Sequence, residues 1–174
     1  MKKTFLLLAP ILIILSCTTI VFEEPQPYGV KSLKTIPAEL RGSFSFVILN
    51  EETIMEIGEN YISKKDGKYF LSDSLIIKKL GNRYVLNTLG KKDEEDSGKW
   101  EVFVLENKGC GFIKGTSFSI NSDSYLDTFQ SLYSGNLIGE GQEKTMVVKA
   151  TADQFNALLK DDSVTISIIL ERLD

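Results

Sequence analysis

The sequence contains few residues of the types that carry out covalent chemistry. It has no histidine and two cysteines, Cys17 and Cys110. The lack of histidine removes the commonest general base, the commonest zinc ligand and the imidazole that activates a serine or cysteine nucleophile. Cys110 stands between Gly109 and Gly111, where a small residue at the start of a strand is a simpler interpretation than a reactive thiol.

Carboxylates are the remaining candidates for acid–base chemistry or cation binding. A glycosidase needs two of them about 5–10 Å apart, but the 24 acidic residues single out no pair. The run Asp93-Glu94-Glu95-Asp96 is interpreted as a solvated loop, and Asn121-Ser122-Asp123 lacks calcium ligands because Tyr125 stands at the third ligand position. Gly139-Glu140-Gly141 does not follow the strand-to-helix turn that holds phosphates. We therefore expect no catalytic residue, no metal and no cofactor, and a protein that is not an enzyme.

Four aromatic side chains in predicted strands are candidates for the wall of an apolar ligand pocket: Trp100, Phe103, Phe112 and Phe118. The alternative is that they fill the core of a sheet, where aromatic side chains contribute much of the buried area. Their spacing does not distinguish a filled interior from a hollow one, so both interpretations stay open.

The first sixteen residues have the composition of a secretory leader. Lys2 and Lys3 form a positive start, and Phe5–Leu15 is an uncharged, largely apolar run of 11 residues. That length lies within the roughly 7–15 residues of a signal-peptide core and below the about 20 residues that a membrane-spanning helix needs. Pro10 in the middle would also disturb a stable helix.

The residues that end this leader indicate how the mature chain is held. Ile14-Leu15-Ser16-Cys17 resembles the lipobox of bacterial lipoprotein signal peptides: aliphatic, variable, small, then an invariant cysteine. The resemblance implies cleavage before Cys17, so that residues 1–16 are removed and Cys17 becomes the acylated first residue. Each acyl CH₂ buried in a bilayer contributes about 0.8 kcal/mol, and two or more chains, such as palmitate, give stable anchoring.

Cleavage changes the charge balance of the chain. Loss of Lys2 and Lys3 leaves 18 basic and 24 acidic residues, a net charge of −6. An acidic domain is repelled by nucleic acid, so we expect no nucleic-acid partner. Cys110 is then the only free thiol, which excludes a disulfide within the mature chain.

Residues 17–41 are predicted to be the lipidated cysteine followed by an extended tether, because they contain three of the four prolines: Pro25, Pro27 and Pro37. Phe22-Glu23-Glu24-Pro25-Gln26-Pro27 together with Ile36-Pro37-Ala38-Glu39-Leu40-Arg41-Gly42 resembles the opening of small uncharacterised lipoproteins of Bacteroidetes-type bacteria. The resemblance implies a lipid-anchored protein of the cell envelope, in the outer membrane, on its periplasmic or its exposed face. Glu23 and Glu24 lie further from the cysteine than the usual export cue of that group.

Residues 42–174 are predicted to form a single β-rich domain. Period-two alternation over 44–48 and 164–170 is typical of half-buried strands. Further strands are expected over 53–57, 61–64, 69–71, 74–80, 84–89, 99–105, 111–120 and 145–149. The turns between them are short, which favours hairpins and an antiparallel β-meander, curved or barrel-like.

Two short helices are expected in the C-terminal third, which makes the fold mainly β with an α+β character. In the first, Tyr125, Phe129 and Leu132 lie on one helical face, with Ser124 as the N-cap and Gly135 as the stop. The second covers 151–160, where Thr151 and Gln154 suit a capping box.

Two functions from different classes remain for such a protein. The first is a membrane-anchored, non-catalytic interaction or structural module that contacts another envelope protein or an extracellular polymer. The second is a carrier of a small apolar ligand that resembles lipocalins in the Leu40-Arg41-Gly42 start of its first strand, although Gly42-Ser43-Phe44 stands where that family has Gly-x-Trp. A cavity on the order of 300 Å³ or more would favour the carrier.

Overall fold

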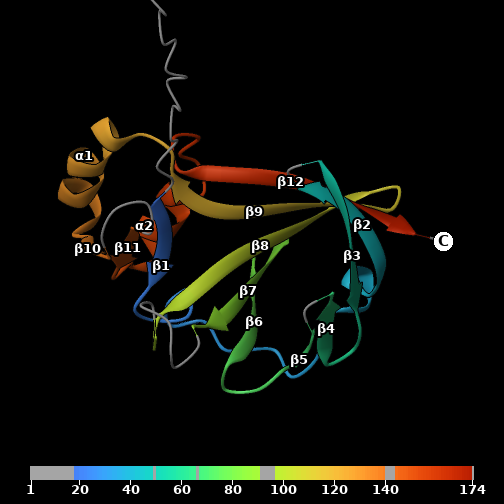
Figure 1. Ribbon diagram of the computed structural model, residues 1–174. Coiled ribbons are helices and arrows are strands. Elements are labelled where there is room, and N and C mark those ends of the chain that lie inside the picture. The colour runs from blue at the N-terminus through green and yellow to red at the C-terminus, as the bar shows by residue number, and fades with distance from the viewer. Residues whose placement is uncertain (1–17, 49, 66, 91–96, 140–143, 174) are drawn as a thin grey trace, which may run out of the picture.

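The computed structural model describes residues 18–48, 50–65, 67–90, 97–139 and 144–173. It is mostly β, with an antiparallel, nearly closed barrel-like sheet and two short helices in the C-terminal part (Figure 1). The predicted fold class is therefore confirmed. The predicted leader, Cys17 and the Asp93–Asp96 run lie outside the described residues.

Two antiparallel meanders of four strands supply most of the sheet. Short turns connect consecutive strands within each meander, as the sequence predicts, except between β7 and β8, where ten residues separate the two strands. The first meander consists of β2 (Gly42–Ile48), β3 (Glu51–Ile57), β4 (Tyr61–Lys64) and β5 (Gly67–Phe70). The second consists of β6 (Leu75–Leu80), β7 (Arg83–Leu89), β8 (Trp100–Gly109) and β9 (Phe112–Ile120).

The last strand, β12 (Thr165–Leu173), joins the two meanders into one sheet. It pairs antiparallel with β9 along seven residues, from Thr165 opposite Phe118 to Glu171 opposite Phe112. The other edge of β12 pairs with β2, where Glu171 lies opposite Ser45. The strand that alternation predicts over residues 164–170 is therefore present and is paired on both its edges.

Two helices and two short strands form the other end of the molecule, at the left of Figure 1. They are α1 (Asp123–Tyr133), β10 (Asn136–Ile138), β11 (Thr145–Val148) and α2 (Ala152–Leu158). The capping box of Thr151 and Gln154 is present at α2. The predicted cap of α1 is wrong by two residues: Ser122 is the N-cap, and Ser134 ends the helix in a left-handed conformation just before Gly135.

The structure does not show an extended tether at residues 18–41, and the β-rich domain does not begin at residue 42. Thr18–Phe22 form a strand, β1, that pairs in parallel with β11, with Thr19 opposite Thr145. Ile20 and Phe22 are buried in the core, at 2% and 0% exposure. Inside a large sheet the five residues of β1 gain buried area and hydrogen bonds. These gains outweigh the tendency of a proline-containing segment to remain a solvated spacer.

The proline-containing segment after β1 is fixed by buried polar side chains rather than left in solvent. The backbone N–H of Gln26 donates to Asn87 Oδ1 at 2.6 Å, and Asn87 Nδ2 donates to the carbonyl of Gln26 at 2.8 Å. Lys78 Nζ donates to the carbonyls of Pro25 and Pro27, at 2.6 and 3.0 Å. Burial lowers the pKa of the Lys78 ammonium. We call Gln26, Lys78 and Asn87 the polar clamp.

Farther along, the same segment contacts the opposite meander. A 3₁₀ turn at Ala38–Leu40 buries Leu40 and places Glu39 beside β7, where Tyr84 Oη donates to Glu39 Oε1 at 2.5 Å. That bond lowers the pKa of Glu39 and raises the pKa of Tyr84 to about 12. Residues 18–41 are therefore part of the folded domain at both their ends.

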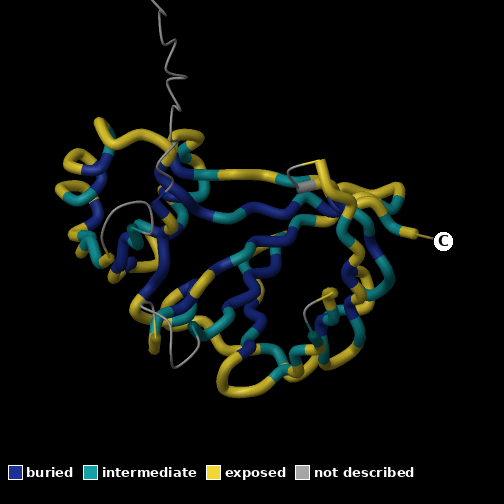
Figure 2. Tube along the Cα trace, viewed as in Figure 1, coloured by how far each residue is buried: buried dark blue, intermediate teal, exposed yellow. Residues whose placement is uncertain are grey.

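The buried side chains form two cores, and the buried residues follow the strands of the sheet and the inner faces of the helices (Figure 2). One lies between the helices and the ends of β1, β8, β9 and β11, and includes Phe22, Phe129 and Phe155. The other lies inside the curved sheet and includes Phe44, Ile77 and Leu105. The boundary between these two cores is where the candidate site lies.

Candidate ligand-binding site

A fork between β8 and β9 opens the sheet next to both cores. The two strands pair from Gly109 opposite Phe112 to Val104 opposite Thr116, and no further. Beyond this point β1 pairs with both: Phe22 lies opposite Trp100 of β8, while Thr18 and Thr19 lie opposite the end of β9. The strands diverge visibly toward β1 in Figure 1. A sheet that is split in this way leaves an unfilled space on its concave side.

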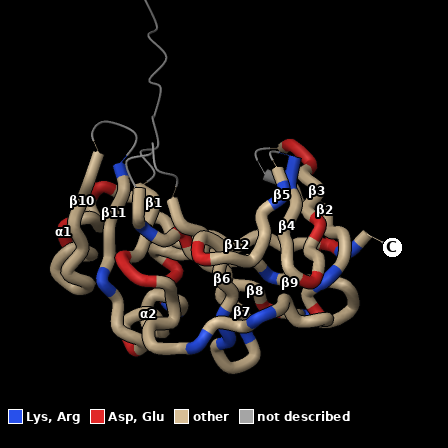
Figure 3. The backbone as a smooth tube through the Cα atoms, turned by 90° about the horizontal axis from the view of Figure 1, so that it is seen from below, with Lys and Arg blue, Asp and Glu red and all other residues tan. Residues whose placement is uncertain are grey.

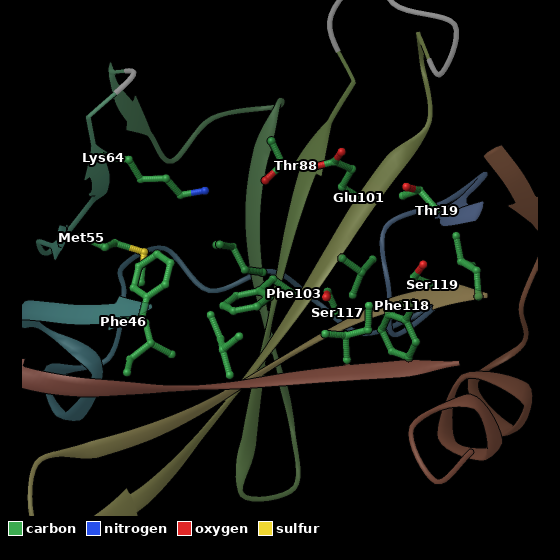
Figure 4. A pocket seen from close by; sticks show the side chains of 16 residues that line it. Thr19, Phe46, Met55, Lys64, Thr88, Glu101, Phe103, Ser117, Phe118 and Ser119 are labelled. Atoms are coloured by element: carbon green, nitrogen blue, oxygen red, sulfur yellow. The ribbon is translucent and has the colours of Figure 1, made fainter. Parts of the chain in front are cut away.

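That space is a cavity of about 420 Å³ (Figure 4). Its walls come from eight strands: six strands of the two meanders, together with β1 and β12. The lining residues are Thr19, Ile20, Phe46, Met55, Lys64, Leu86, Thr88, Glu101, Val102, Phe103, Ser117, Phe118, Ser119, Ile166, Ile168 and Leu170. The volume lies within the roughly 300–1,000 Å³ typical of small-molecule sites.

Most of the wall is apolar and held in place by the cores behind it. Phe46, Met55 and Leu86 belong to the core inside the curved sheet, and Val102 and Phe118 belong to the core under the helices. All five are at most 9% exposed. Because each is packed on its rear side, the cavity is not lined by side chains that are free to collapse into it.

Gly115 determines where the ring of Phe103 lies. A Cβ at position 115 would stand 2.2 Å from the tip of that ring and 3.1 Å from Leu170 Cδ1. The tip of the ring therefore occupies the space that a side chain at position 115 of β9 would fill. A glycine inside a strand often marks such a close approach.

Polar groups lie at two places on the wall. Lys64 extends inward from β4 toward Thr88 and Glu101, which stand on β7 and β8 (Figure 4). At the other side, Thr19, Ser117 and Ser119 line the ends of β1 and β9. Within the described part of the chain Lys64 forms no ion pair. The cavity is thus amphipathic, with a cation at one side of an apolar chamber.

The structure brings together two of the four aromatic residues proposed as a pocket wall. Phe103 and Phe118 line the cavity. Trp100 is 9% exposed and belongs to the core under the helices, and Phe112 is 39% exposed at the start of β9, so neither lines it. The distinction depends on the fork between β8 and β9, which no local pattern indicates.

Other wall residues carried a weaker sequence signal. Phe46 is part of the predicted alternation in β2, which correctly places it inside the sheet, but alternation does not tell a core position from a cavity position. Lys64 ends a predicted strand, where a lysine is usually solvated. Its inward direction follows from strand alternation, because Lys64 lies on the same face of β4 as the buried Ile62.

A smaller hollow of about 160 Å³ lies next to Arg83, Glu106, Lys114 and Ser167. Two of its charged side chains are paired with each other: Glu106 lies 3.4 Å from Arg83, and it also accepts from Lys108 at 2.8 Å. Both cations lower the pKa of Glu106, with the Lys108 hydrogen bond as the largest cause. This hollow is therefore a poorer candidate for a ligand site.

The remaining candidates for chemistry are isolated. Cys110 is exposed in the tight turn between β8 and β9, where its φ of 50° and the positive φ of Gly109 and Gly111 close the hairpin. Among the described residues no group of three or more cysteine, aspartate or glutamate side chains is placed to hold a metal ion. None of the helices in the described ranges has the length and apolarity of a membrane-spanning helix.

Comparison with protein-family models, with curated proteins and with solved structures finds no match to this chain. The site is therefore interpreted from its own geometry.

Proposed function

We propose that the protein is a carrier or receptor for a small, largely apolar molecule in the bacterial cell envelope. The observation that supports this proposal is the cavity of about 420 Å³ between the two cores, which exceeds the about 300 Å³ that separates a ligand carrier from a filled domain. Its apolar wall and few polar groups are the usual composition of a small-molecule site. The proposal does not include catalysis.

The test is whether the cavity holds a ligand. We would purify the chain from residue 17 onward with Cys17→Ser under mild conditions, and record its native mass spectrum and the contents of an organic extract. A bound molecule of defined mass is expected. Recovery of a clean ligand-free mass, together with no uptake from a library of apolar compounds, would contradict the carrier function.

Two matched substitutions connect that ligand to the cavity. Val102→Phe adds a ring to the wall, whereas Val47→Phe adds the same ring on the outside of β2, where Val47 is 64% exposed. Loss of the ligand from the first variant only is expected, since the space in the cavity is limited. Retention by both variants would show that the ligand binds elsewhere.

The location of this carrier follows from the leader. Acylation of Cys17 would hold the domain on a membrane of the envelope, for which the outer membrane is our expectation. Replacement of Cys17 by serine in the full-length chain should move the protein to the soluble fraction and abolish labelling by a tagged fatty acid. Persistent labelling of this variant would contradict the lipoprotein assignment.

An interaction module is the second candidate, because one outer face of the sheet exposes apolar side chains. Ile54 of β3, Val47 of β2 and Ile169 of β12 are 54–64% exposed on three adjacent strands. In the view of Figure 3 the acidic and basic residues of the described ranges are interspersed. Two results together would favour an interaction module over a carrier. The purified protein would contain no ligand, and its binding to a membrane-bound protein partner would be lost in Val47→Lys but kept in Val102→Phe.

A further inference from the structure

We infer that the ligand is a single-chain amphiphile with a carboxylate head group, and that Lys64 binds that carboxylate. This inference rests on the proposed carrier function and specifies its ligand. It combines three observations: the size of the cavity, the distribution of apolar and polar groups on its wall, and the lack of an ion-pair partner for the only lysine that lines it among the described residues.

The volume limits the ligand to one chain. At about 30 Å³ for a group the size of a water molecule, 420 Å³ holds on the order of 14 non-hydrogen atoms. A saturated carboxylic acid of about that size fits, whereas a two-chain phospholipid is several times too large. Phe46, Met55 and Phe118 would contact the chain and gain its hydrophobic free energy of transfer.

The charge distribution sets the position of the head group. Lys64 points from β4 into the space, so its ammonium can meet a ligand atom without leaving the rim (Figure 4). Glu101 stands on the β8 side of the same rim, and its carboxylate has no hydrogen-bond donor to offer an anionic head group. An anionic head group is therefore placed on the β4 side, beside Lys64. Thr88, which lies between Lys64 and Glu101, can donate its hydroxyl group to the same head group.

The polar groups at the other side of the cavity do not offer an equivalent anion site. Ser119 already donates to the carbonyl of Thr18 at 3.2 Å. Ser117 and Thr19 are neutral hydroxyl groups, which bind anions more weakly than a charged ammonium does. The chain of the ligand would thus run from Lys64 toward β1 and β9.

Three ligands of equal chain length test the inference: dodecanoic acid, dodecanol and dodecylamine, each below its micelle-forming concentration. Their dissociation constants would be measured by displacement of a neutral fluorescent probe, using the chain from residue 17 onward with Cys17→Ser. The acid is expected to bind about three- to fivefold more tightly than the alcohol, because a partly exposed ion pair contributes little more than that. The amine should bind most weakly, and 0.5 M salt should reduce the differences.

Substitutions then assign the preference to one residue. Lys64→Met should abolish the difference in affinity between the acid and the alcohol, and Lys64→Arg should keep that difference. Lys34→Met, at an exposed lysine outside the cavity, is the matched control and should behave as the unaltered chain.

The outcomes separate the two proposals. Equal binding of acid and alcohol, or a preference that survives Lys64→Met, overturns the carboxylate inference and leaves the carrier function intact. Failure of all three ligands to bind contradicts both. A preference for the amine would assign the head-group site to Glu101 and also overturn the inference.

Discussion

At the scale of single residues, the open interior depends on a glycine. Gly115→Ala would place a methyl group 2.2 Å from the ring of Phe103, and position 115 has no positive φ that would exclude alanine. The ring must move into the cavity, and overpacking of this kind costs about 1–3 kcal/mol. We expect the variant to bind the cavity ligand at least about fivefold more weakly, which a displacement titration measures.

A second substitution serves as the control for that prediction. Phe103→Leu removes most of the displaced ring, so the double variant with Gly115→Ala should regain part of the lost affinity. Unchanged binding in the single variant, or no recovery in the double one, would mean that Phe103 does not limit the space.

The predictions for single residues were correct where a contact joins neighbours in the chain, and wrong where a position depends on distant strands. The capping box of Thr151 and Gln154 involves neighbours in the chain and was predicted correctly. The four aromatic candidates were chosen by type, yet only Phe103 and Phe118 line the cavity, because strand divergence beyond Val104 decides which faces meet it. Lys64 lies on the same face of β4 as the buried Ile62, so alternation indicates its direction, but not that a cavity lies in front of it.

At the scale of elements, the polar clamp holds the segment that follows β1. Asn87 is fully buried and its amide group serves both the N–H and the carbonyl of Gln26, so Asn87→Leu leaves two buried backbone groups without partners. Each such group costs about 1–3 kcal/mol. We expect the free energy of unfolding in urea to fall by about 2–4 kcal/mol, and the amides of β1 to exchange faster with deuterium.

Asn156→Leu provides the comparison for this variant. Asn156 is exposed on α2 and donates to the carbonyl of Ala152, so its replacement should change stability by less than about 0.5 kcal/mol. Similar effects of the two substitutions would show that the clamp does not stabilise the segment.

The 3₁₀ turn at Ala38–Leu40 predicts a pH dependence of stability through Tyr84 and Glu39. Glu39 has a lowered pKa in the folded protein, so its contribution is present above about pH 4.3 and is lost as the pH falls through the folded value. Tyr84 has a pKa raised to about 12, so its contribution is complete below about pH 10 and is lost as the pH rises through 12.

Tyr84→Phe should therefore lower the free energy of unfolding by about 1 kcal/mol between pH 5 and 10, and by less at either extreme. Urea titrations of both proteins from pH 3 to 12 measure this difference. Tyr28→Phe, at a residue that is 59% exposed, should show no such pH profile. A difference that stays constant over the whole range would exclude the Tyr84–Glu39 hydrogen bond as its cause.

The element-scale predictions missed two strands, β1 and the three-residue β10. Local alternation and turns predict the eight strands β2 to β9 and both helices, whereas β1 was interpreted as the start of a tether. Its five residues lie beside a proline-containing segment and pair in parallel with β11, more than 120 residues away. Parallel pairing with a distant strand leaves no short-range pattern in the sequence.

At the scale of the whole molecule, β1 determines how an anchored domain would lie on the membrane. Thr18 directly follows Cys17 and is already 1% exposed inside the sheet, so no spacer separates the predicted lipid from the fold. The end of β9 pairs with Thr18, and β9 extends nine residues away from it, about 30 Å at the rise of a strand. The turn that contains Cys110 should therefore point away from the bilayer.

This orientation can be measured with the free thiol that the chain already has. A fluorophore on Cys110 should be quenched weakly by lipids that carry a quencher in the head group. The same fluorophore on Ser122→Cys, in a Cys110→Ser background, should be quenched strongly because Ser122 lies two residues beyond the end of β9. Acylated Cys17 has no free thiol and does not react, and the Cys17→Ser chain should show no quenching at either position.

Equal quenching at both labels would mean that the domain stands off the membrane. Strong quenching at Ser122→Cys alone would place the Thr19 and Ser119 side of the cavity next to the bilayer, where an amphiphile could pass between lipid and protein without crossing water.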